Sequence, residues 1–352
     1  MIETDILIVG GGIAGASLGA ALAGRRRVML IEREANCGHH STGRSAAFWL
    51  ESYGGPAVAP LSRASHDFLA GRGWLKPRGA IHISRLDEFD ALPPLAALDR
   101  VAMEQRIPGL RPTWRHGREE PGCSDIDVAA LHGFTLATLR RAGGEVRTEA
   151  QLVEAVRDGA EWRVMLSDGS AIRAEVLVNA AGAWADKVAA AAGVRPLGIV
   201  PKRRTMVQLR VGRSGLKDLP LVIDAHGQFY FKGEGDRTIW LSPHDEIDCA
   251  PCDAAPEEVD VARAIDRFQA VVDWPVEALE RRWAGLRSFA PDRVPIYGYD
   301  LRVPDFFWCA GQGGFGIQTA PAAAALAAAL LLGETPNLDP APYDPARFGD
   351  LS

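Results

Sequence analysis

Three glycines and one carboxylate near the N-terminus have the types and the spacing to bind the phosphates and ribose of a nucleotide. Gly10, Gly12 and Gly15 follow an apolar run at 6–9 and open a small-residue stretch. In a strand–turn–helix unit, the first allows the sharp turn, the second lets a pyrophosphate approach and the third lets the helix lie close on the strand. Glu32 ends a second apolar run at the spacing of an acid that accepts hydrogen bonds from ribose hydroxyls. The set predicts a dinucleotide-binding site, with an ordinary βαβ turn as the alternative.

Three later segments could complete that site. The polar loop at 41–47 carries the hydroxyl and guanidinium donors that phosphates require, although its composition alone would fit an ordinary loop. Small residues at 180–183 end a buried strand, and a glycine-rich turn at 311–316 precedes an Ala-rich run. Small side chains at a strand end permit close approach of a ligand. The last turn can aim a second positive helix end at that ligand.

The composition is that of an ordinary folded protein. The chain has 352 residues, 47% of them hydrophobic and 24% charged, with a formal net charge of −6. The length suggests two domains or one elaborated α/β domain, and the acidic balance argues against nucleic acid as the main partner. The first five residues lack the positive charge of a signal peptide, and the apolar run at 320–332 is too short to span a bilayer and is broken by Pro321 near its start. We expect a cytoplasmic protein without stable membrane insertion, and a peripheral membrane contact stays open.

The five cysteines, at positions 37, 123, 249, 252 and 309, fit a reducing compartment better than a disulfide framework. Cys249 and Cys252 have the spacing of a redox motif. They lie, however, in an acidic, proline-containing stretch without a preceding strand, and no second ligand pair for zinc accompanies them. An incidental loop pair is therefore favoured over a redox or metal role.

The hydrophobic periodicity places these motifs on a series of elements. Helices are expected around 61–69, 95–106, 127–141 and 257–272, and over the Ala-rich segment after 320. Strands are expected at 80–84 and in a meander at 151–156, 162–166 and 171–175, which leads into a second buried strand from 176. Asp158-Gly159 and Asp168-Gly169 are the turn signals of that meander. Residues 196–282 read as mostly β.

In this order the motifs resemble the D-amino-acid oxidase superfamily of FAD-dependent amine oxidoreductases, and within it most closely the bacterial FAD-dependent D-arginine dehydrogenases. The finer resemblance covers nearly the full length and rests on the segments 44–47, 125–127, 192–198, 201–204 and 283–289. It implies an α/β fold with a Rossmann-like FAD-binding domain assembled from separated segments, 1–49, 121–195 and 283–352. It also implies a β-rich (α+β) substrate-binding domain from 50–120 and 196–282.

The resemblance implies a non-covalent FAD cofactor, since no cysteine lies at 288–297, where some relatives attach the flavin. The residues expected to bind it are Gly10, Gly12, Ile13, Ala14, Gly15, Glu32, Arg33, Ser41, Thr42, Gly43, Arg44, Ser45, Ala46, Ala47, Val153, Ala181, Gly182, Trp184, Gly313, Gly314, Phe315, Gly316 and Ile317.

The resemblance also implies the reaction, which is oxidative deamination of a D-amino acid to a 2-oxo acid and ammonia by hydride transfer from Cα to flavin N5. Arg204 and Arg287 match the arginines that hold the substrate carboxylate, a bidentate task that suits guanidinium. Tyr53 and Tyr230 match the tyrosines that flank the substrate. The flavin carries the difficult chemistry, so no side-chain base is strictly required.

Two positions depart from the D-arginine dehydrogenase pattern. Ala80 replaces an acid that receives the substrate guanidinium, and Phe48 replaces a histidine, with Leu50 alongside. A cationic side chain would be buried there without a partner, at a cost of several kcal/mol. We therefore expect a preference for neutral, hydrophobic D-amino acids. Polar substitutes could come from Glu51, His82 or His226.

Two other functions stay open. The same superfamily includes oxidases and dehydrogenases of sarcosine, glycine and proline-like amines, and a flavin-binding subunit without turnover is a third reading. A nicotinamide enzyme is disfavoured because a second glycine-rich fingerprint is not evident. The electron acceptor is expected to be O2 or a quinone, and Lys232 could influence reactivity with oxygen.

Overall fold

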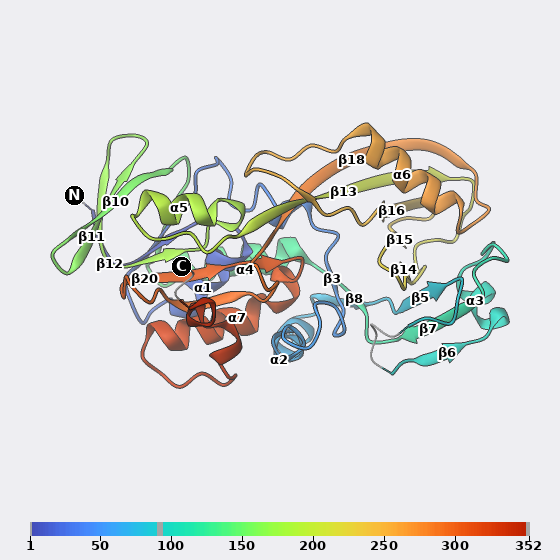
Figure 1. The fold of residues 1–352 in the computed structure, drawn as a ribbon, viewed down its shortest axis with the longest axis horizontal. Coiled ribbons are helices and arrows are strands. Elements are labelled where there is room, and N and C mark those ends of the chain that lie inside the picture. The colour runs from blue at the N-terminus through green and yellow to red at the C-terminus, as the bar shows by residue number, and fades with distance from the viewer. Residues whose placement is uncertain (1, 90–93, 350–352) are drawn as a thin grey trace.

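The computed structural model describes residues 2–89 and 94–349, so the outermost ends of the predicted domain ranges, residues 1 and 350–352, lie outside it. The expected α/β class is confirmed. Figure 1 shows two halves side by side, with both chain ends in the left half. The long strands β13 (Val200–Val211) and β18 (Val276–Phe289) run from one half into the other.

The left half is built on a mixed sheet in the order β10-β11-β12-β1-β2-β9, with β20 beside β12 and β19 beside β20. Five of its strands, β9, β2, β1, β12 and β20, run parallel, with β9 at the edge. The strands are β1 (Ile2–Val9), β2 (Val28–Ile31), β9 (Glu145–Arg147), β10 (Leu152–Asp158), β11 (Glu161–Leu166), β12 (Ala171–Asn179), β19 (Ile296–Tyr299) and β20 (Phe306–Ala310).

Helices cover both faces of this sheet, which is why its central strands are continuous apolar runs. On one side α1 (Ile13–Leu22) packs against α4 (Val128–Arg141) and α7 (Gly316–Leu331), and α2 (Ala59–Ala70) packs on α7. On the other side lies α5 (Ala185–Ala191). Short 3-10 helices occur at Thr42–Arg44, Gly182–Trp184, Ala341–Tyr343 and Pro345–Phe348.

The right half is a second sheet in the order β21-β18-β13-β16-β15-β14-β5-β7-β6, with β17 on β13. Its further strands are β5 (Ala80–Ser84), β6 (Ala96–Leu98), β7 (His116–Glu120), β14 (Leu221–Asp224), β15 (Tyr230–Gly233), β16 (Thr238–Ser242), β17 (Ile247–Asp248) and β21 (Gln312–Gly313). The helices α3 (Arg100–Arg106) and α6 (Glu258–Gln269) accompany it. A small sheet of β3 (Phe48–Trp49), β8 (Ser124–Ile126) and β4 (Leu75–Pro77) joins the halves.

Three local predictions need correction. The helix expected around 95–106 begins only at Arg100, because 96–98 pairs with β7 as a strand and Asp99 caps the helix by accepting a hydrogen bond from the Ala102 amide. The third meander strand and the buried strand after it are one strand, β12. Pro321 lies inside α7 and does not break it.

The domain boundaries expected from the sequence stay a proposal, and one of them falls within a strand. Residue 283 falls inside β18, whose pairing with β13 is continuous on both sides of that point. Among the described residues no helix is both long enough and apolar enough to cross a membrane.

Candidate active site

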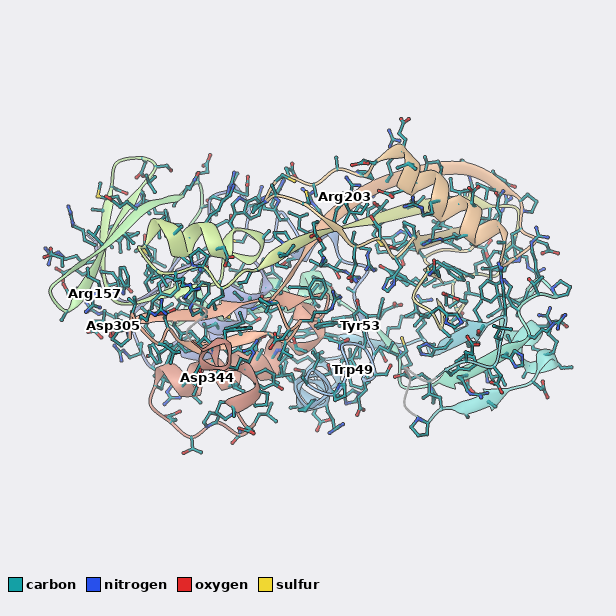
Figure 2. All side chains as sticks on the ribbon, viewed as in Figure 1. Trp49, Tyr53, Arg157, Arg203, Asp305 and Asp344 are labelled. Carbon is teal, nitrogen blue, oxygen red and sulfur yellow. The ribbon has the colours of Figure 1, made fainter. Side chains whose placement is uncertain are left out.

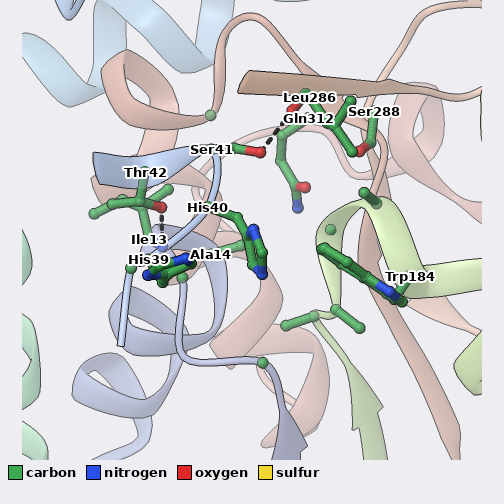
Figure 3. A pocket seen from close by; sticks show the side chains of 18 of the residues that line it. Ile13, Ala14, His39, His40, Ser41, Thr42, Trp184, Leu286, Ser288 and Gln312 are labelled. Carbon is green, nitrogen blue, oxygen red and sulfur yellow. Dashed lines mark hydrogen bonds between the residues drawn. The ribbon is translucent and has the colours of Figure 1, made fainter. Parts of the chain in front are cut away.

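A cavity of about 440 Å³ lies where the C-terminal ends of β1, β2 and β12 meet the strands β13 and β18. Its wall combines residues far apart in the sequence, and Figure 3 shows part of it, with Trp184 opposite His40 and the Gln312 side chain between them and Leu286. This is the crevice in which open α/β sheets bind their ligands.

The glycine-rich turn has the geometry that nucleotide binding requires. Gly10 has φ +112°, a conformation that L side chains rarely adopt. A Cβ atom at Gly15 would overlap the carbonyl oxygen of Gly10, so the absence of a side chain lets α1 lie close on β1. Gly12 precedes the first turn of α1 and faces the cavity. The positive end of the helix is thus directed to the cavity, where a phosphate would be stabilised.

Glu32 directly follows β2, and the residue is 9% exposed. It accepts hydrogen bonds from the backbone amide of Gly11 at 2.8 Å and from that of Glu34 at 3.0 Å. These contacts fix the carboxylate beside the glycine turn. The remaining lone pairs can accept from a ribose diol.

Several side chains of the polar loop after Glu32 form hydrogen bonds within the protein. Ser41 donates to the carbonyl of Leu286 at 2.6 Å, as Figure 3 shows. Thr42 Oγ1 accepts from the Ile13 amide at 3.0 Å. The Arg44 guanidinium pairs with Asp253 and donates to the carbonyl of Ala254. These bonds attach the loop to both halves, and the Thr42 hydroxyl, which accepts here, can still donate to a ligand.

Most of the residues predicted to bind the cofactor line the cavity. They are Gly10, Gly12, Ile13, Ala14, Glu32, Arg33, Ser41, Thr42, Arg44, Ser45, Ala46, Val153, Ala181, Gly182, Trp184, Gly313, Gly314, Gly316 and Ile317. Gly15, Gly43, Ala47 and Phe315 do not line it. Gly15 acts in helix packing, and Phe315 lies in an apolar cluster with Val58 and Phe289.

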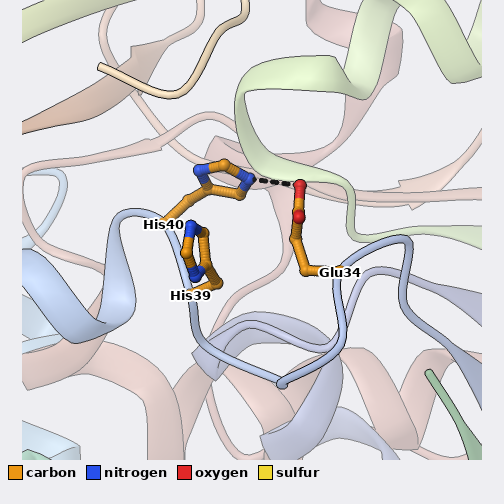
Figure 4. A group of neighbouring side chains, drawn as sticks. All are labelled: Glu34, His39 and His40. Atoms are coloured by element: carbon orange, nitrogen blue, oxygen red, sulfur yellow. Dashed lines mark hydrogen bonds and ion pairs between the residues drawn. The ribbon is translucent and has the colours of Figure 1, made fainter. Parts of the chain in front are cut away.

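Sequence reasoning missed several lining residues, among them His39, His40, Gln151, Lys187, Ser288 and Gln312. His40 packs on the ring of Trp184 at a centroid distance of 4.6 Å, and the Arg33 guanidinium lies 4.9 Å from the same ring. Figure 4 shows His40 Nε2 bonded to Glu34 Oε1, 2.9 Å away, with His39 beside them. The His39 ring contacts that of His40 at a centroid distance of 4.8 Å, so these two contacts bring the three side chains together. The two histidines line the cavity together with Glu32.

Arg204 and Arg287 are brought together by the pairing of β13 with β18. Arg204 stands opposite Gly285 and Lys202 opposite Arg287, so both arginines lie on the same face of the sheet. Arg204 is 4% exposed, and its Nε donates to the Asp245 carbonyl at 2.7 Å. Its Nη1 has no hydrogen-bond partner among the described residues. Burial and the neighbouring Arg287 lower the pKa of Arg204. An anion in the cavity would satisfy both guanidinium groups.

The two predicted tyrosines differ in their contacts. Tyr53 Oη accepts a hydrogen bond from Arg287 Nη1 at 2.7 Å, although Tyr53 itself does not line the cavity. A Cβ atom at Gly314 would stand 2.6 Å from Tyr53 Oη, so the glycine leaves room for this pair. Tyr230 does line the cavity, and its hydroxyl donates to the sulfur of Met206 at 3.1 Å.

The residues predicted to form the substrate pocket lie behind this wall. Leu50 is 2% exposed and Ala80 1%, and neither lines the cavity. Phe48 packs on the rings of Tyr53 and Tyr230 at 5.7 and 5.8 Å. Together with Met206 and Trp240 they form one apolar cluster. The side of the cavity at Tyr230 is therefore apolar.

The polar residues considered as substitutes for the missing acid do not reach the cavity. His82 is paired with Glu120 at 3.0 Å, Glu51 pairs with Arg63, and His226 lies near Ser84 in a separate groove. Lys232 is buried and pairs with Asp125 at 2.8 Å. Its amine therefore stands apart from the cavity.

His244 is a residue near the site that sequence reasoning missed. It has φ +56°, its ring packs on Tyr230 at 5.7 Å, and its Nδ1 donates to the Gly227 carbonyl. Burial, Arg204 and Arg287 together lower the pKa of His244 to about 3. The imidazole is therefore neutral at physiological pH, and it adds no third positive charge beside the arginines.

This depressed pKa predicts an acid-sensitive contribution to stability. An unfolded histidine binds its proton near pH 6.5, whereas the folded His244 does not do so until about pH 3. The free energy of unfolding is therefore undisturbed above pH 6.5 and falls as the pH drops, by roughly 2 kcal/mol at pH 5. His244→Asn keeps a side-chain donor, tolerates positive φ and cannot titrate. Urea unfolding at pH 7.5 and 5.0 should show that this variant loses less unfolding free energy between the two pH values than the wild type. Equal losses in the two proteins would contradict the prediction.

Comparisons with known proteins identify the family. The family model described as FAD dependent oxidoreductase matches residues 5–330. The chain is 27% identical to a glycine oxidase of Pseudomonas aeruginosa over 97% of its length and 98% of that protein. It is also 27% identical to a D-amino-acid oxidase of Bradyrhizobium diazoefficiens, over 70% of this chain and 58% of the other.

The fold agrees with these matches. The crystal structure of glycine oxidase from Geobacillus kaustophilus superposes with a TM-score of 0.85, covering 99% of both chains at 22% identity. The relatives are named glycine oxidase and D-amino-acid oxidase, so the finer resemblance to D-arginine dehydrogenases stays a proposal. The family model matches residues 5–330, and the glycine turn and Glu32 line the cavity. The chain therefore belongs to the family of FAD-dependent oxidoreductases, and its cofactor is FAD.

Proposed function

We propose that this protein oxidises D-amino acids with neutral, hydrophobic side chains to 2-oxo acids and ammonia, and that O2 or a quinone takes up the electrons. The observation that carries the proposal is Arg204. Its Nη1 is buried without a partner at a cavity that Arg287 also lines. A carboxylate is the anion that every α-amino acid offers, and two guanidinium groups can bind it in a fixed orientation.

The site residues divide the task of orienting the substrate. When bound, FAD supplies the acceptor for the hydride that leaves Cα. Arg204 and Arg287 hold the carboxylate, the Tyr53 hydroxyl is bonded to Arg287, and Tyr230 lines the same cavity. The apolar cluster of Phe48, Met206 and Trp240 borders the position of the substrate side chain. The resulting imino acid is hydrolysed by water. No cysteine lines the described cavity, which supports a non-covalent cofactor.

A panel of amino acids tests this proposal. Mixed with the holoenzyme without oxygen, D-leucine, D-methionine or D-phenylalanine should bleach the flavin absorption, and their L-forms should not. D-Arginine should be at least about 100-fold less efficient, because burial of an unpaired cation costs about 3 kcal/mol or more. The proposal fails if D-arginine is the best substrate of the panel. Absence of bleaching by any amine would favour a flavin-binding subunit without turnover.

One observation favours a second candidate, oxidation of glycine, sarcosine or a similar small amine. Leu50 and Ala80 are buried apart from the cavity, which limits the space beside Tyr230 for a substrate side chain. The 27% identity to a glycine oxidase over nearly the whole chain agrees with a small substrate. The same panel decides between the two candidates. Bleaching by glycine or sarcosine, but by none of the larger D-amino acids, would establish the second.

A further inference from the structure

Two of the cysteines lie in contact in the segment between β17 and α6. Cys249 Sγ and Cys252 Sγ are 3.5 Å apart, and both side chains are partly exposed. A disulfide bond is about 2.05 Å long, so the sulfurs would need to approach by about 1.5 Å, which side-chain rotation in a loop can supply. Cys123 and Cys309 are buried, and burial raises the pKa of Cys309 to about 12. The contact between their sulfur atoms distinguishes Cys249 and Cys252 from the other cysteines.

The pair lies in a segment whose neighbouring residues contact side chains of the candidate active site. Upstream, the Asp245 carbonyl accepts from Arg204 Nε, and the Glu246 carboxylate lies 3.3 Å from Arg204 Nη2. Downstream, Asp253 pairs with Arg44 of the cofactor loop. Both thiols pack on a small apolar cluster that includes Trp184 and Leu286, and these two residues also line the cavity, whereas the cysteines do not. The dithiol is therefore separated from the cavity by that layer of side chains.

We propose that Cys249 and Cys252 form a reversible dithiol–disulfide site that hydrogen peroxide oxidises. One thiolate attacks the O–O bond of the peroxide and becomes a sulfenic acid, and the other peroxide oxygen leaves as water after taking a proton. The second thiolate then attacks the sulfenic sulfur and expels hydroxide, which takes a proton and leaves as a second water. In sum, two thiols and one peroxide give one disulfide and two waters, and the thiols lose two electrons to the peroxide.

The proposed function would place a source of this oxidant nearby, because a flavoenzyme that passes its electrons to O2 releases peroxide. Only that source rests on the proposed function. The site itself is tested with added peroxide and a chemical readout that needs no turnover, so either can fail without the other.

The experiment exposes the reduced holoenzyme to hydrogen peroxide and then counts free thiols after denaturation. We expect two of the five thiols to disappear and to return with dithiothreitol. Mass spectrometry should find the peptide that carries Cys249 and Cys252 lighter by two hydrogen atoms before reduction.

Single variants supply the matched controls. Cys249→Ser and Cys252→Ser should each leave one thiol that a dimedone probe traps as sulfenic acid, without a disulfide. Cys37→Ser removes another partly exposed cysteine and should not change the loss of two thiols. The proposal is wrong if all five thiols survive peroxide, or if two thiols are still lost together in Cys249→Ser.

Discussion

Replacement of Arg204 or Arg287 by methionine should lower kcat/KM for the best amino-acid substrate by about 10²- to 10³-fold. Each guanidinium is expected to form charge-assisted hydrogen bonds with a carboxylate in a largely dry site, and truncation of one partner of such a pair costs about 2–5 kcal/mol. Methionine retains most of the apolar volume of arginine, so the loss should report on charge and hydrogen bonds. Anaerobic reduction of the flavin by the substrate, followed in a stopped-flow instrument, measures it.

Lys202→Met is the matched control for this prediction. Lys202 lies on the same strand, two positions before Arg204, and pairs with Asp248 away from the cavity. It should keep the wild-type rate of flavin reduction. FAD content must be equal in all variants for the comparison to hold. If Arg204→Met and Lys202→Met show the same small decrease in kcat/KM, the carboxylate does not bind at Arg204.

Gly12→Ala should fold normally and yet bind FAD about 10- to 100-fold more weakly, because overpacking at a tight contact costs about 1–3 kcal/mol. In the protein alone, a Cβ atom at Gly12 would meet only Thr42 Oγ1, at 3.3 Å, and the backbone φ of −72° suits any residue. The constraint on this position therefore comes from the ligand in the cavity. FAD content after purification and the Kd from flavin fluorescence quenching measure the effect.

Variants of two other glycines serve as controls for this prediction. Gly133→Ala lies on α4 with open space around it and should leave FAD binding unchanged, with helix stability raised by roughly 0.5–1 kcal/mol. Gly15→Ala would overlap the carbonyl of Gly10 and should impair folding itself. Wild-type FAD affinity in Gly12→Ala would show that the pyrophosphate does not approach this turn.

The sequence predicted several elements well because their signals are local. In the second sheet β5 has the predicted bounds, and in the nucleotide-binding half Asp127 caps α4 where the helix was expected to begin. The turn at Gly10 has the positive φ that a glycine supplies. The strand at 96–98 was missed for the opposite reason. Its residues read as helical by themselves, and they become a strand only because β7 lies beside them.

The sequence by itself predicted the βαβ unit, because backbone conformation and hydrophobic periodicity depend on near neighbours. FAD and the two candidate arginines followed from the resemblance to the D-amino-acid oxidase superfamily. The tertiary structure decided which side chains face the cavity. Pairing of β13 with β18 brings Arg204 close to Arg287. The Arg44 guanidinium, which the sequence suggested as a phosphate ligand, forms an ion pair with Asp253. His244 and the Cys249–Cys252 contact likewise arise from segments far along the chain. Polar groups pair with the partners that folding brings within reach, and that choice is made only when distant strands meet.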